Sequence, residues 1–139
     1  MTVSVEWQQD YQFDVINDHN FHFPVDNNNE SATCPTDILL SALGSCCSGE
    51  VVAGLKQQGV ELFGMKTDVS YTLTDTQPRL FKSVNLHFII KGFGLNDSMV
   101  NQVIESAINE NCHVALMLKP TMAITYTYHV VQISKELAS

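Results

Sequence analysis

Positive charge is scarce in this sequence. Seven Lys and Arg residues stand against 15 Asp and Glu residues among 139, which gives a formal net charge of −8 and a pI of about 4.8. The basic residues are scattered, and Arg79 is the single arginine. Because nucleic acids and anionic membrane surfaces are recognised through clustered Lys and Arg, we expect neither as a partner.

Long apolar runs and export signals are also missing. We expect no apolar run that approaches the roughly 20 residues of a membrane span. The N-terminal stretch MTVSVEWQQD has neither the basic nor the apolar region of a signal peptide. We therefore expect a cytoplasmic protein without a membrane segment. Cysteines are normally reduced in that compartment, so an even number of them does not imply a disulfide framework.

The cysteines lack metal-ligand spacing. Cys34, Cys46, Cys47 and Cys112 form no C-x-x-C pair, and no His lies at the spacing of a zinc site, so we expect no metal and no other cofactor. A buried cysteine is most often a small hydrophobic residue. We interpret Cys47 in that way, and Cys34 as incidental.

One long apolar segment dominates what is present. Residues 35–60 read PTDILLSALGSCCSGEVVAGLKQQGV, and their apolar positions recur at three-, four- and seven-residue spacing, which predicts a helix. Pro35 suits the first turn, Thr33 is the expected cap, and Gly59 is the expected C′ residue that ends the helix.

The interior of this helix is poor in charge, which predicts burial on most sides. Glu50 is the only charged residue between Ile38 and Leu55. Gly44 costs about 1 kcal/mol relative to Ala inside a helix, so its presence indicates close packing.

The remaining pattern predicts an α+β fold in one domain, residues 1–139. Runs of strands flank two helical regions without regular alternation of strand and helix. Asn96 is the expected N-cap of the second helix, and a short helix is expected to run from Cys112 to Leu118. The expected strands cover residues 3–8, 12–16, 21–25, 66–74, 81–91 and 121–133.

Cys46 and Cys112 are the candidates for redox chemistry. Each interrupts an apolar helical row among small or polar neighbours, and Cys112 follows Ile108 by one turn, at a possible helix N-terminus that would favour a thiolate. A peroxide-reducing site needs a thiolate that becomes a sulfenic acid and a second thiol that resolves it as a disulfide. The two cysteines are 66 positions apart, and spacing alone does not show that they meet.

Two segments together resemble the OsmC/Ohr family of osmotically inducible and organic hydroperoxide resistance proteins. The first is the 35–60 segment with its GSC motif. The second is RLFKSVNLHFIIKGFGLNDSMVNQVIESAINENCHVALML, in which a strand, a helix and a cysteine-bearing turn follow in the family's order. The resemblance runs from about Pro35 to Tyr128.

This resemblance implies a fold, an assembly and an activity. The fold is OsmC-like, with antiparallel sheets packed on two main helices, and the assembly is an intertwined homodimer with the long helices at its centre. The activity is a thiol-dependent peroxidase, in which Cys46 is the peroxidatic and Cys112 the resolving cysteine. The implied reductant is a dithiol, which in the hydroperoxide-specific branch is a lipoyl group.

The chain departs from the family at the residues that support the thiolate. The family's Arg comes from the N-terminal strands, but no Lys or Arg precedes Lys56 here. The family's carboxylate position holds Thr36, with Asp37 beside it. Asp37, Glu50 and Arg79 are therefore the candidate supporting residues.

Two other functions stay open. Loss of the family's Arg also fits a dimeric binding protein that holds a small hydrophobic ligand in an apolar cleft around Cys46. A third possibility is a redox sensor that forms a disulfide without rapid turnover.

Overall fold

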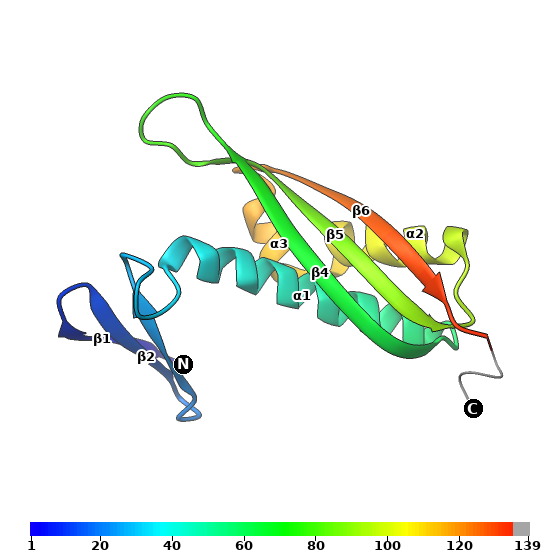
Figure 1. Ribbon diagram of the computed structural model, residues 1–139, viewed down its shortest axis with the longest axis horizontal. Helices are drawn as coiled ribbons and strands as arrows, with labels where there is room; N and C mark the ends of the chain where they lie inside the picture. The colour runs from blue at the N-terminus through cyan, green and yellow to red at the C-terminus, as the bar shows by residue number, and fades with distance from the viewer. Residues whose placement is uncertain (135–139) are drawn as a thin grey trace. The chain divides into compact units, whose positions relative to one another are not determined.

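A computed structural model describes residues 1–134 and shows a mixed α+β fold (Figure 1). Two compact units, residues 1–41 and the chain from Ala42 onward, are described in turn. The elements, in chain order, are β1 (Val3–Gln9), β2 (Gln12–Asn17), β3 (His22–Asp26), α1 (Pro35–Gln57), β4 (Glu61–Leu73), β5 (Phe81–Phe93), α2 (Asp97–Ser106), the single turn η1 (Ala107–Asn111), α3 (His113–Leu118) and β6 (Ala123–Gln132).

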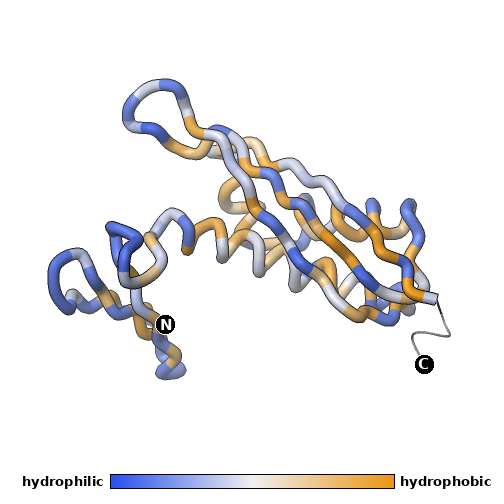
Figure 2. The backbone as a smooth tube through the Cα atoms, viewed as in Figure 1, coloured by the Kyte–Doolittle hydropathy of each residue, from blue (hydrophilic) through white to orange (hydrophobic). Residues whose placement is uncertain are grey.

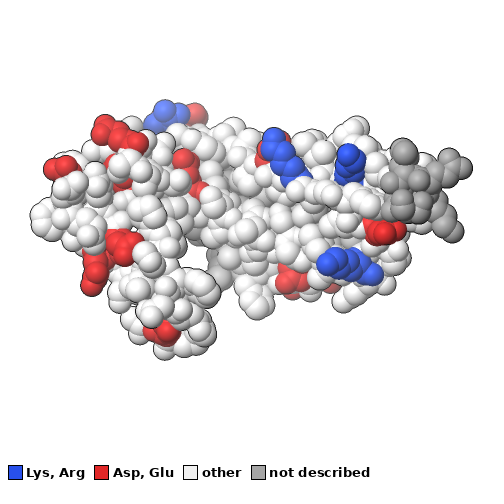
Figure 3. Space-filling model, turned by 60° about the horizontal axis from the view of Figure 1, so that its bottom comes forward, with Lys and Arg blue, Asp and Glu red and all other residues white. Residues whose placement is uncertain are grey.

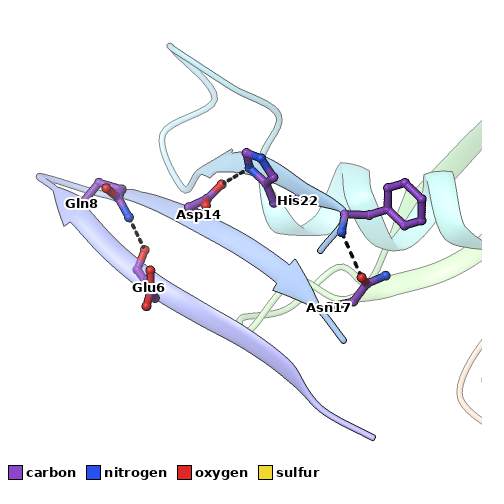
Figure 4. A network of polar contacts seen from close by, with 6 residues as sticks. Glu6, Gln8, Asp14, Asn17 and His22 are labelled. Carbon is purple, nitrogen blue, oxygen red and sulfur yellow. Dashed lines mark hydrogen bonds and ion pairs between the residues drawn. The ribbon is translucent and has the colours of Figure 1, made fainter. Parts of the chain in front are cut away.

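The N-terminal unit is an antiparallel sheet in the order β1-β2-β3. Side chains alternate between its two faces, so cross-strand neighbours form two apolar rows on one face. These rows are Val5–Val15–Phe23 and Trp7–Phe13–Val25. Polar contacts include the pair of His22 Nδ1 and Asp14 Oδ1 at 3.4 Å (Figure 4).

A tight loop joins β3 to α1, and the Asp26 carboxylate organises it. This side chain is 3% exposed and accepts bonds from the Asn28 amide at 2.8 Å and from the Ser31 amide and hydroxyl at 3.0 and 2.8 Å. These bonds, led by the Ser31 amide, lower the pKa of Asp26, because they favour the charged form. The loop thus delivers the chain to the start of α1 in a defined conformation.

Local chemistry sets both ends of α1. Pro35 opens the helix as predicted, but the expected cap was one residue off. The carbonyl of Cys34, not Thr33, accepts the first helical bond, from Ile38 N at 3.1 Å, because the Thr33 carbonyl is already paired with Asp26 N at 3.2 Å. At the other end Gly59, at φ +81°, closes the helix as predicted. Val60 N bonds Leu55 O, and Gly59 N bonds Lys56 O, as in a Schellman motif.

A buried stripe on α1 supports the core of the second unit. The stripe repeats every four residues and consists of four side chains with no exposed surface, Leu43, Cys47, Val51 and Leu55. By length and composition α1 is long and apolar enough to cross a membrane, so the prediction that no segment approaches a membrane span was wrong in this respect. In this fold the stripe makes it a core helix.

Close packing explains a glycine inside α1, as predicted. A Cβ added at Gly44 would lie 2.9 Å from Val69 Cγ2 on β4. A hydrogen bond of 2.7 Å between the hydroxyls of Ser48 and Thr67 joins the same two elements. The helix therefore approaches the sheet closely at the turn that carries the cysteines.

The sheet of the second unit has the order β4-β5-β6, with the helices on one of its faces (Figure 1). The central strand β5 alternates between the two faces, a pattern visible in the hydropathy of Figure 2. β4 begins five residues earlier than predicted, at Glu61. The prediction of antiparallel sheets holds for β1-β2-β3 and for β4-β5, but β5 and β6 are parallel. The helices between them provide the long crossover that parallel strands need. The core side chains of β5 are Val84, Leu86, Phe88 and Ile90.

The crossover between β5 and β6 contains a change of helical pitch. Asn96 caps α2 as predicted, since its side chain accepts from Met99 N at 2.9 Å. After Ser106 the helix widens into the π-type turn η1. The Cys112 amide therefore bonds Ala107 O at 2.7 Å, five residues back, and Cys112 does not continue the Ile108 row as expected. Such turns in proteins often accompany functional sites.

Candidate functional site: a cluster of three thiols

Three of the four cysteines come together in the second unit. The thiols of Cys46 and Cys47 both lie close enough to Cys112 to act on its pKa. Cys47 and Cys112 have no exposed surface, whereas Cys46 is half-buried. The cluster therefore combines one sulfur that solvent can reach with two that it cannot.

Helix geometry explains the difference between the neighbours Cys46 and Cys47. Cys47 occupies the buried stripe between Leu43 and Val51, each four residues away. Successive helical residues point about 100° apart. Cys46 therefore points toward the edge of the stripe, where it retains exposure.

The turn η1 and the start of α3 position Cys112. Its backbone is extended, at φ −74° and ψ 108°, between the wide turn and α3. Its Sγ accepts a hydrogen bond from Ala115 N at 3.4 Å, so the sulfur caps the short helix. The short helix therefore begins at His113, one residue later than predicted, with Cys112 as its cap, and it ends at Leu118 as predicted.

The surroundings keep the two buried thiols protonated at neutral pH. Burial raises the pKa of Cys47 strongly, with further increases from its hydrogen bond to Cys112 and from nearby negative charge, including Glu50. Burial also raises the pKa of Cys112, although the hydrogen bonds with Cys47 and with Ala115 N act in the opposite direction. Among the described residues, no Lys or Arg is one of the main causes of either shift.

The three candidate supporting residues differ in their relation to the cluster. Glu50 is half-buried and close enough for its charge to act on Cys47. Asp37 lies in the first turn of α1, two and a half turns before Cys46 in the sequence. Arg79 is exposed in the β4–β5 loop, where its Nε donates to Thr74 O at 3.2 Å. On the face shown in Figure 3, Lys and Arg lie singly and form no basic patch.

A polar groove of about 300 Å³ lies between the second half of α1 and the α2–η1 segment, and none of the three cysteines lines it. At Gly54, one of its lining residues, an added Cβ would lie 2.7 Å from Val103 Cγ1. Glu50, Gln102, Ser106, Glu110 and Asn111 are among its lining residues. Its carboxylate, amide and hydroxyl groups suit polar occupants better than apolar ones.

Cys47 is the site residue that sequence reasoning missed. It occupies a core position, as expected, but the same position brings its sulfur to Cys112. The available signal was that Cys46 and Cys47 are adjacent, so a partner that meets one can also meet the other.

The fold and its thiols define a small α+β protein with cysteines on its core helix and on the crossover turn. A family model described as OsmC-like protein matches residues 26–127, and the chain belongs to this family. The Escherichia coli K12 protein YhfA is 32% identical over 105 residues, which cover 76% of this chain and 78% of YhfA.

Solved structures share the fold. An OsmC-like protein from Mycoplasma pneumoniae superposes with a TM-score of 0.82 at 15% identity, over 94% of this chain and 96% of that one. A Legionella pneumophila protein described as an organic hydroperoxide resistance protein OsmC superposes with a TM-score of 0.67 at 17% identity, over 96% and 98%. The predicted fold class is thereby confirmed.

Proposed function

We propose that this protein is a thiol-dependent peroxidase that reduces organic hydroperoxides through Cys46 and resolves the product through Cys112. One observation carries the proposal: the half-exposed thiol of Cys46 is close enough to the buried thiol of Cys112 to act on its pKa. Membership of the OsmC-like family supports the same chemistry.

The proposed cycle has three balanced steps. The Cys46 thiolate attacks the O–O bond of ROOH, which with one proton gives Cys46–SOH and ROH. The Cys112 thiol then attacks the sulfenic sulfur, which forms the Cys46–Cys112 disulfide and releases water. A dithiol reduces that disulfide by two exchange steps and is itself oxidised to a disulfide. We propose the reducing cytoplasm as the compartment, because it supplies such reductants.

With no guanidinium nearby, neutral hydrogen-bond donors would have to stabilise a thiolate in this cluster. A hydrogen bond to a thiolate favours the charged form. In this cluster the Ala115 amide donates such a bond to the Cys112 sulfur at 3.4 Å. A neutral hydrogen-bond donor stabilises an anion less strongly than a positively charged donor does. We therefore expect slower peroxide reduction than in a site that contains Arg.

The decisive test is hydroperoxide consumption with cumene hydroperoxide and dihydrolipoamide. We expect turnover by the wild type, and none by Cys46→Ser, because serine cannot form a sulfenic acid. The Cys112→Ser variant should consume one equivalent of hydroperoxide per chain and then stop. Its sulfenic acid at Cys46 should be trapped by dimedone. Full turnover by Cys46→Ser would refute the proposal. Cys34→Ser is the matched control.

We also propose that the functional unit is a homodimer. In the N-terminal unit Val3, Val5 and Trp7 of β1 are 64%, 61% and 65% exposed. A three-stranded sheet needs a covered apolar face for stability. A second copy of the chain would supply that cover.

A second function, binding of a small hydrophobic ligand, is favoured by one observation. An apolar groove of about 410 Å³ lies in the N-terminal unit, lined by side chains of β1–β3 and by Pro35 and Ile38. Cys46 is not among its lining residues, so this groove is separate from the cleft expected around that thiol. Native mass spectrometry of the purified protein tests this function: a small apolar molecule retained by the wild type and lost in Phe13→Asp would support it.

A further inference from the structure

We propose that the polar groove between the second half of α1 and the α2–η1 segment binds a linear aliphatic amine of the polyamine class. The groove has a volume of about 300 Å³, which is within the range of small-molecule sites. Its lining contains no residue of the proposed peroxidase cycle. The proposal therefore stands or falls separately from that function.

The two helices give this groove two chemically different ends. α2 runs back along α1 (Figure 1), and the two helices are in close contact where Gly54 meets Val103. On α1, Glu50 lies on one side of this contact and Gln58 on the other, about 12 Å apart at 1.5 Å per residue. Because the helices are antiparallel, Glu110, which follows Val103 by seven residues, lies toward the same end as Glu50.

The first end is acidic and lacks a positive partner. The side chains of Glu50 and Glu110 both line the groove, and neither forms an ion pair within residues 1–134. Glu50 is half-buried and is the only charged residue between Ile38 and Leu55. As the described residues define it, the lining contains no Lys, Arg or His. A partly buried carboxylate without an opposite charge is costly, so this end favours a positively charged group of a ligand.

The rest of the groove suits an apolar chain that ends in a second donor. Gly54 and Val103 contribute apolar surface at the middle, where methylene groups can pack. The far end is lined by three glutamine side chains, Gln57, Gln58 and Gln102. Their amide oxygens can accept hydrogen bonds from an ammonium group. This order of carboxylate, apolar surface and amide matches a polyamine, in which short methylene chains separate protonated nitrogens.

An organic cation fits this groove better than a metal ion does. Two carboxylates provide fewer protein ligands than a dedicated calcium site uses. Within residues 1–134 no three His, Cys, Asp or Glu side chains are placed to hold a metal ion together. A volume of about 300 Å³ also far exceeds that of a single ion. The test below nevertheless includes Mg²⁺ as a competing probe.

The test is calorimetric titration of the reduced full-length protein with spermidine at about 0.15 M salt, which screens attraction to the overall charge of −8. We expect one site per chain, and no binding of hexane-1,6-diol, which has the methylene chain without the charges. Glu50→Gln should weaken spermidine binding about tenfold or more, because it removes a charged acceptor. Glu110→Gln, at an exposed side chain, should also weaken it. Glu105→Gln is the matched control, since it removes an equal charge from α2 outside the groove.

A second measurement locates the bound amine. In ¹⁵N-labelled protein, spermidine should shift the side-chain amide resonances of Gln57, Gln58 and Gln102, whereas hexane-1,6-diol should not. An equal loss of affinity in all three carboxylate variants would mean that spermidine follows only the overall charge, and it would overturn the proposal. So would unshifted glutamine amides at saturation, or Mg²⁺ that binds as tightly as spermidine and displaces it.

Discussion

The thiols of the cluster differ more in their solvent exposure than in the charges around them. Cys46 and Cys47 are neighbours in sequence, yet one is half-buried and the other has no exposed surface. Desolvation disfavours the thiolate, and it is the largest cause of the raised pKa of both Cys47 and Cys112. A single helical step of about 100° thus separates a half-exposed sulfur from one that is fully buried.

Stability at alkaline pH provides a prediction at this scale. Because the pKa of Cys47 is raised in the folded state, the folded protein holds this proton after the unfolded chain has lost it. Stability is therefore fully present below the ordinary thiol pKa of about 9 and falls above it, by up to about 1.4 kcal/mol per pH unit for each such thiol. Urea unfolding under reducing conditions from pH 7 to 10 measures this slope.

The matched variants identify the thiol responsible for this slope. Cys47→Ala should flatten the alkaline decline, whereas Cys34→Ala controls for loss of a thiol outside the cluster. A Cys47→Ala slope equal to that of the wild type would show that the decline arises elsewhere.

At the scale of the elements, α1 and η1 bring the sulfurs together. The close approach of α1 to β4 at Gly44 sets the depth of the helix in the core. The wide turn η1 shifts the hydrogen-bonding of Cys112 from Ile108 to Ala107 and ends the helix there, so that the sulfur can cap α3. Each element supplies one side of the cluster.

Two glycines of α1 allow a matched test of this packing. At Gly44 an added methyl group meets Val69, so Gly44→Ala should destabilise by about 1–2 kcal/mol despite the helix propensity it gains. At Gly49 nothing lies within 4 Å of the added atom, so Gly49→Ala should stabilise by about 0.5–1 kcal/mol. Chemical denaturation of both variants measures the difference.

A second substitution shows whether the clash is the cause. Adding Val69→Ala to Gly44→Ala removes the opposing methyl groups, so the pair should be more stable than the sum of the two single changes predicts. Strict additivity of the two changes would rule out this contact as the reason for the glycine.

At the scale of the whole molecule, a single chain leaves apolar residues of β1 exposed to solvent, with nothing to cover them. Trp7 is 65% exposed and Phe23 on β3 is 44% exposed. Exposed apolar surface of this extent marks an interaction site in most proteins. It is the basis for the proposed homodimer.

Adjacent residues of β1 that point to opposite faces test the dimer. Val5 belongs to the apolar rows of the sheet, whereas Ser4 points to the other face. Light scattering after size exclusion should give twice the chain mass of 15.5 kDa for the wild type and for Ser4→Asp. Val5→Asp should shift the protein toward the monomer or reduce its folded yield. A wild-type protein that is monomeric at all concentrations would contradict the proposal.

The sequence predicted those features that depend on a few neighbouring residues. Gly59 and Asn96 were placed correctly, because each acts through bonds within five positions in the sequence. Pro35 was placed correctly because its fixed backbone angle and missing N–H suit the first turn of a helix. The cap of α1 was misplaced by one residue because Thr33 pairs with Asp26, seven positions back. The parallel pairing of β5 with β6 was not predicted, since strand alternation does not encode the direction of a partner strand.

By itself the sequence determined the class of fold, the end of α1 at Gly59, the cap of α2 and the identity of the thiols, since these follow from periodicity, capping and composition. Only the tertiary structure decided that Cys112 meets both Cys46 and Cys47, and that Cys47 is a member of the cluster. The physical reason is that the encounter depends on how closely α1 approaches the sheet and on the wide turn before Cys112. The cysteines themselves lie 66 positions apart, and no local pattern of residues records that they meet.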